Sequence, residues 1–210
     1  MLRRLSLAIS LAIASVSLHA ATYTLEPNYT QGIVRWNHIG FSMPTGQFAQ
    51  AQGTLEFDAE NPTRSSVKVT IPVSSLHTGV PELDEHLRSA DFFDAAKFPS
   101  ITFNSTRLEK GAQANRFEVT GNLTVHGVTR PVTLDVRFLK SGTNPITEVP
   151  TVGFDATVTL KRSDFGLGKF VPLVGDEVEL HITTQGAEAK AYAAYLKAQA
   201  DEAAKESARK

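Results

Sequence analysis

The chain has 210 residues, with 21 lysines and arginines, 22 aspartates and glutamates, and no cysteine. A formal net charge of −1 excludes the basic surface that binds nucleic acid or anionic lipid, so we expect no nucleic-acid partner. Without cysteine the fold has no disulfides and must rest on burial and hydrogen bonding. This length suits one domain with a full hydrophobic core.

Residues 1–20 have the pattern of a secretory signal peptide. Arg3 and Arg4 precede a short apolar stretch that ends at small residues, and we place the cleavage after Ala20. A retained membrane anchor is the alternative, but the stretch is shorter than the roughly 20 apolar residues of a membrane span. The bacterial-looking signal and the lack of disulfides predict export to the periplasm.

From residue 22 to about residue 186 apolar and polar residues alternate, which gives each strand one apolar and one solvent-facing side. The alternation is clearest in segments 67–73, 117–125, 132–138, 152–160 and 178–182. Turn residues separate the segments at Asn61-Pro62, Lys110-Gly111, His126-Gly127, 141–145 and Gly175-Asp176. The pattern predicts about eight strands, most of them longer than usual.

Strands with one apolar face need that face covered, and closing the sheet covers it while removing exposed edges. We therefore predict an all-β fold, a closed antiparallel β-barrel of about eight strands. A two-sheet sandwich is the alternative. An eight-stranded barrel holds either its own side chains or one small ligand, and an apolar composition does not distinguish these cases.

Two segments break the alternation. Residues 81–90, which begin with Pro81, predict a short helix between strands, followed by a turn over residues 91–94. Residues 187–210 are rich in Ala, Glu and Lys and predict a C-terminal helical tail. We expect the last strand to end before Gly186, ahead of this tail. We expect this tail to be solvated rather than a dedicated partner site.

No motif in the chain indicates catalysis or metal binding. The histidines form no H-x-x-x-H pair and cysteine ligands are absent, so we expect no metal site. No Ser stands in a Gly-x-Ser-x-Gly setting, and Ser89 near His86 and Asp91 is better explained as a cap than as part of a triad. Residues 162–166 are typical of a structured turn with a buried Phe165.

Several motifs, taken in order, resemble the YceI-like family of periplasmic lipid-binding proteins over nearly all of residues 21–186. They are Gly46-x-Phe48, Gly53-x-Leu55-x-Phe57-Asp58, segment 86–94, Phe98-Pro99-x-Ile101-x-Phe103, segment 121–132, Gly153-Phe154-x-Ala156, segment 162–166 and segment 174–178. Asn122 stands where the family often has Asp. The resemblance implies a lipocalin-like barrel whose open interior takes an extended apolar chain, such as a polyisoprenoid, a prenyl quinone or a fatty amide. It implies no catalytic residue and no cofactor apart from such a bound lipid.

The resemblance and the alternation together predict a ligand site inside the barrel. His38, on the same face as Val34 and Trp36, is a candidate polar contact to a head group. The predicted ligand-contacting residues are Trp36, His38, Phe48, Phe57, Ile71, Phe103, Phe117, Val119, Phe154, Ala156 and Val158.

These observations favour a periplasmic binding or carrier protein for a long apolar ligand, not an enzyme. An enzyme acting on such a lipid is the second hypothesis. A protein that acts through transient contact with an inner-membrane protein, with use of the tail, is the third. The sequence leaves open whether the protein is a monomer or a dimer.

Overall fold

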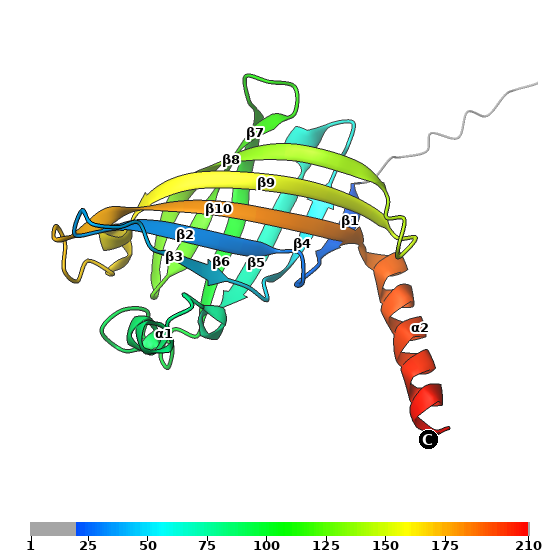
Figure 1. Cartoon of the computed structure of the whole chain (residues 1–210). Helices are drawn as coiled ribbons and strands as arrows, with labels where there is room; N and C mark the ends of the chain where they lie inside the picture. Colours follow the sequence, from blue (N-terminus) through cyan, green and yellow to red (C-terminus); the bar gives the residue numbers. More distant parts are fainter. Residues whose placement is uncertain (1–19, 210) are drawn as a thin grey trace, which may run out of the picture.

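The computed structural model describes residues 20–209, which form an antiparallel barrel with two α-helices (Figure 1). Apart from Ala20, the predicted signal peptide lies outside the described residues. The helices are α1 (Pro81–Arg88) and α2 (Ala189–Ser207), with short 3-10 helices η1 (Pro62–Arg64), η2 (Val73–Ser75) and η3 (Arg162–Phe165). The strands are β1 (Ala21–Leu25), β2 (Gln31–His38), β3 (Thr45–Phe48), β4 (Gln52–Phe57), β5 (Ser66–Pro72), β6 (Ser100–Lys110), β7 (Arg116–Val125), β8 (Val128–Thr143), β9 (Pro150–Lys161) and β10 (Val174–Glu188).

The barrel closes through eight of the ten strand segments. Their order is β1-β4-β5-β6-β7-β8-β9-β10, and β1 pairs back onto β10, with Tyr23 opposite Glu188. Every pairing in the ring is antiparallel, so the prediction of a closed antiparallel barrel rather than a sandwich is confirmed.

The two remaining segments, β2 and β3, arise because two long strands of the barrel are each interrupted in the middle. β1 and β2 are the two halves of one such strand, and β3 and β4 are the two halves of the next. β10 pairs with β2 as far as Thr183 opposite Gln31, and then with β1 from Gly186 opposite Leu25. β3 and β4 pair with β2 and β1 in the same way. The chain leaves the ladder at residues 26–30 and again at residues 49–51. Residue alternation does not reveal such breaks, because it continues on either side of them.

The turn signals were partly correct. His126 and Gly127 form a two-residue turn between β7 and β8, with φ of 50° and 73°, as a type I′ hairpin requires. Two other expectations were wrong. β8 continues through Thr143, and Gly175-Asp176 lies inside β10, where the register with β2 shifts between Val174 and Val178. Glycine in a strand marks a bulge as readily as a turn, which explains the second error.

Helix α1 lies in the long connection between β5 and β6, and a buried carboxylate holds it there. Asp84 is only 4% exposed, and it accepts hydrogen bonds from the Thr78 hydroxyl at 2.6 Å and the Thr78 amide at 2.7 Å. His77 Nδ1 lies 3.1 Å from the same carboxylate, and the Arg88 guanidinium lies 3.6 Å from it. The Thr78 hydrogen bonds lower the pKa of Asp84, with a smaller contribution from His77.

Asp84→Asn is expected to reduce the free energy of unfolding by about 2 kcal/mol, because hydrogen bonds to a charged group are the strong ones. At this chain size that lowers Tm by about 4–8 °C. Because the folded pKa of Asp84 is depressed, its contribution is present at neutral pH and is lost as the pH falls through that pKa. The difference from wild type should therefore shrink below about pH 4.

Thermal unfolding of both proteins between pH 7 and pH 3 checks this expectation. Asp91→Asn is the matched control, because Asp91 pairs with Lys169 on the surface, where such pairs contribute about 0–1 kcal/mol. Equal Tm changes for the two variants would show that Asp84 does not anchor the connection.

Helix α2 extends from the barrel end where β1 lies (Figure 1). The strand end expected before Gly186 is too early, because β10 continues two residues beyond Gly186 to Glu188. Ala187 is 1% exposed and paired with Thr24 and Thr151. Glu188 then caps α2 by accepting a hydrogen bond from the Ala191 amide at 2.7 Å. The alternation fades at Gln185-Gly186, whereas the ladder itself continues.

Deletion of residues 189–210 is therefore expected to leave the barrel folded, with Tm lowered by no more than about 4 °C, or roughly 1 kcal/mol. Deletion of residues 187–210 should cost more, since it removes two paired residues of β10. Calorimetry of both truncated proteins tests this order. A fall above about 8 °C for the shorter deletion would show that α2 belongs to the core.

Candidate ligand-binding cavity

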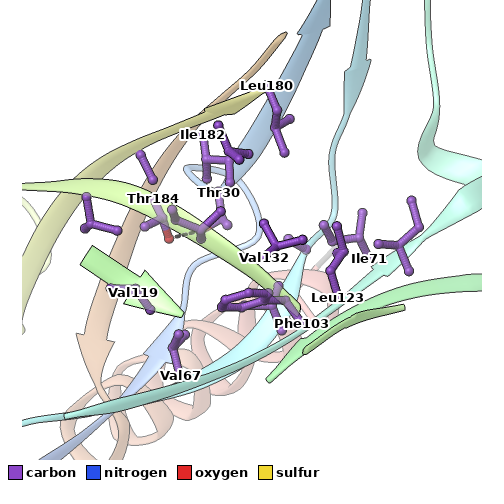
Figure 2. Close-up of a pocket in the computed structure, with 18 of the residues that line it drawn as sticks. Thr30, Val67, Ile71, Phe103, Val119, Leu123, Val132, Leu180, Ile182 and Thr184 are labelled. Atoms are coloured by element: carbon purple, nitrogen blue, oxygen red, sulfur yellow. Dashed lines mark hydrogen bonds between the residues drawn. The ribbon is translucent and has the colours of Figure 1, made fainter. Parts of the chain in front are cut away.

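A cavity of about 280 Å³ lies inside the barrel, lined by inward-facing side chains from all ten strand segments. Its volume is close to the lower end of the range for small-molecule sites. Aromatic and aliphatic side chains form nearly all of the wall, and Phe103, Val119 and Ile182 are among those shown in Figure 2. Two separate apolar clusters contribute side chains to the wall, and they extend beyond it to Tyr23 and Val152 in one case and to Val73 and Leu76 in the other.

Nine of the eleven predicted ligand-contacting residues lie on this wall. They are Phe48, Phe57, Ile71, Phe103, Phe117, Val119, Phe154, Ala156 and Val158. The structure brings them together because each lies on the apolar side of a strand that faces the bore. That they contact a ligand stays a prediction.

The other two predicted residues, Trp36 and His38, are not on the cavity wall. They share the inward face of β2 with Val34, but β2 runs on past the cavity to the barrel rim. There the His38 amide donates to the Ser42 carbonyl at 2.9 Å, and the His38 side chain is exposed. Alternation assigns a residue to a face and does not say how far along the strand the cavity extends.

Sequence reasoning missed the polar residues of the wall, which are Thr30, Gln31, Ser65, Ser66, Arg162 and Thr184. Thr30 ends the break between β1 and β2, where no periodic pattern exists. The apolar wall residues that were not named, such as Leu134 and Leu180, follow the same alternation as the named ones.

Arg162 is the charged residue among those that line the cavity, and its guanidinium donates hydrogen bonds to backbone carbonyls. Its Nε donates to the Gly175 carbonyl at 2.8 Å, and its two Nη atoms donate to the carbonyls of Lys169 and Val174, both at 2.9 Å, and of Leu167. Burial lowers the pKa of Arg162, and the nearby Asp176 carboxylate opposes this. Arg162 therefore fastens the loop between β9 and β10 to the barrel.

The wall offers a guest apolar surface and a few hydroxyl groups. Within residues 20–209, no group of three or more His, Asp or Glu side chains could hold a metal ion. No helix in the same part of the chain is long and apolar enough to cross a membrane. The arrangement suits retention of an apolar molecule by burial of its surface.

Comparison with known proteins identifies the family. The family model described as the YceI-like domain matches residues 23–186. Protein YceI of Salmonella arizonae is 38% identical over 183 residues, which cover 86% of this chain and 94% of that protein. The chain belongs to the YceI-like family. The resemblance found in the sequence motifs is thereby confirmed.

Solved structures of similar proteins have the same barrel. Burkholderia cenocepacia BcnA matches this YceI-like chain with a TM-score of 0.69 and 26% identity, over 77% of this chain and 98% of BcnA. A Campylobacter jejuni YceI protein matches with a TM-score of 0.64 and 26% identity, over 72% and 89%. A polyisoprenoid binding domain from Saccharophagus degradans, at 15% identity and a TM-score of 0.60 over 80% and 99%, shares the fold.

Proposed function

We propose that this YceI-like protein binds or carries a long apolar molecule inside its barrel, with a polyisoprenoid, a prenyl quinone or a fatty amide as the kind of guest. The observation that carries the proposal is a cavity walled almost entirely by aliphatic and aromatic side chains along the length of a closed barrel. The proposal is supported by the chain's membership of the YceI-like family, because resemblance to that family implies guests of this kind.

Burial of apolar surface supplies the affinity in this proposal. Each buried methylene contributes about 0.8 kcal/mol, so ten of them contribute on the order of 8 kcal/mol before the cost of association is subtracted. The ligand then needs no charged group of the protein to hold it, in agreement with the hydrogen bonds that Arg162 already donates to backbone carbonyls. The protein acts by holding its ligand, not by chemical conversion, since the wall presents apolar groups where an enzyme needs acids, bases or nucleophiles.

The protein works in the periplasm, where it protects an apolar molecule from water between membranes or enzymes.

Transient contact with an inner-membrane protein is part of the proposal, and the barrel rim suits it better than the tail. Exposed apolar side chains project there from two loops, with Phe41 91% exposed, Phe170 51% and Leu173 62%. The loops are adjacent, because His38 pairs with Val174. A photo-crosslinker at position 41 in intact cells tests for such a contact.

Native mass spectrometry of the protein purified from the periplasmic fraction tests the main proposal. The expected spectrum contains the mature chain with a noncovalent apolar molecule that organic solvent extracts intact. An extract that contains only a chemically altered product, formed on incubation with the protein, would favour the enzyme hypothesis. A chain that carries no lipid and takes up none when lipid is offered would refute binding.

A further inference from the structure

Two threonine hydroxyls meet on the cavity wall at the point where the barrel's first strand is broken. Thr30 is the residue before β2, and Thr184 lies on β10 between the part that pairs with β2 and the part that pairs with β1. The two Oγ1 atoms are 2.8 Å apart, and Figure 2 shows the pair beside the apolar wall residues. Thr30 is only 4% exposed, Thr184 is partly buried, and both line the cavity.

This pair has a hydrogen to spare. A hydroxyl has one hydrogen to donate and two sites that accept, so one hydrogen between the two oxygens satisfies their mutual bond. The other hydroxyl keeps its hydrogen, and within residues 20–209 neither side chain makes a second hydrogen bond. A buried donor without an acceptor costs free energy, and a guest that supplies the acceptor recovers it.

Three other polar side chains of the wall have hydrogen-bond partners within the protein. Arg162 donates to four backbone carbonyls, and the Gln31 side-chain carbonyl accepts from the Gln47 amide. Ser65 accepts from the Asp58 amide at 3.0 Å, in the loop between β4 and β5. Because Arg162, the charged residue among these, directs four of its five N–H groups to backbone carbonyls, an ionised head group gains little inside the barrel to offset its desolvation.

We infer that the Thr30–Thr184 pair is the subsite that anchors the polar group of the ligand, and that the ligand is an uncharged lipid with a carbonyl-type hydrogen-bond acceptor. This inference rests on the proposed function and narrows its ligand class. A carbonyl oxygen of a quinone, an amide or an ester accepts the spare hydrogen, while the apolar chain fills the bore. A pure hydrocarbon leaves that donor unsatisfied.

A matched pair of probes tests the subsite on the delipidated mature protein. Methyl palmitate carries a carbonyl acceptor, whereas heptadecane carries none, and each is titrated against bound N-phenyl-1-naphthylamine by its fluorescence. Thr30→Val and Thr184→Val are combined in one double variant, because either change alone leaves a hydroxyl whose hydrogen can go to the guest. The double variant is expected to weaken methyl palmitate about three- to tenfold, the range of one neutral hydrogen bond, and to leave heptadecane unchanged or slightly tighter.

Two controls separate the subsite from general damage to the barrel. Thr120→Val and Thr133→Val remove hydroxyls from a pair with the same mutual bond, at 2.9 Å, on the outer face, and they should change neither probe. Thr30→Ser keeps the hydroxyl and should keep the preference for the ester.

Equal weakening of both probes by the inner double variant, or no weakening, would overturn the subsite while leaving the proposed function intact. Loss of ester binding in Ser65→Ala but not in the inner double variant would overturn it as well, by assigning the anchor to Ser65. Failure of both probes to displace the fluorophore from wild type would overturn the proposed function itself.

Discussion

Val119→Asp is expected to abolish ligand binding and to lower the stability of the barrel. Val119 lies on β7 with 5% of its surface exposed, in an apolar cluster with Phe103 and Phe117. A carboxylate at this position has no cation or donor beside it, and its burial costs several kcal/mol unless it takes up a proton. The introduced carboxyl should therefore have a raised pKa, so its destabilising effect is largest above that pKa and declines as the pH falls through it.

Thermal unfolding and displacement of N-phenyl-1-naphthylamine measure the two effects. Asn122→Asp is the matched control, because Asn122 is on the same strand with its side chain exposed, and the substitution places a carboxylate in water. It should change Tm by no more than about 2 °C, since such surface changes are usually within 0.5 kcal/mol. If Val119→Asp behaved like Asn122→Asp, the inward face of β7 would have to be in contact with water rather than with apolar side chains.

The sequence predicts the closed barrel well because its main determinant is local. Each strand repeats every two residues, and the hairpin at His126-Gly127 has residues that suit a two-residue turn. The inward position of Phe103, Val119 and Ala156 follows from that period alone, and nine predicted residues do line the cavity.

The remaining features depend on contacts between distant parts of the chain. The break at residues 26–30 is defined by distant pairing, because β1 and β2 both pair with the one long strand β10. The depth of the cavity is likewise a property of the whole barrel, which is why Trp36 and His38 were assigned to it and Thr30 was not. Whether the bore is open or filled depends on the summed volumes of side chains from every strand, and no local pattern encodes that sum.

Ala156→Phe should remove ligand binding while leaving the barrel stable. Ala156 lies on β9 between Val136 and Ile182 of the neighbouring strands, with its small side chain at the cavity wall. A phenyl ring there occupies space that the ligand needs, and an open cavity accepts the added volume with little strain. In a filled core the same substitution overpacks and typically costs 1–3 kcal/mol, or about 2–12 °C in Tm at this size. Thr157→Phe, at the next and outward position, controls for the added ring itself.

The lipid-to-protein ratio of the Ala156→Phe variant, measured by solvent extraction and mass spectrometry beside its Tm, tests the open cavity most directly. Wild type and Thr157→Phe should carry an apolar molecule after purification from the periplasm, and Ala156→Phe should carry almost none at a Tm within about 3 °C of wild type. A large fall in Tm for Ala156→Phe, together with a wild-type protein that carries no lipid, would contradict the account and indicate a barrel filled by its own side chains.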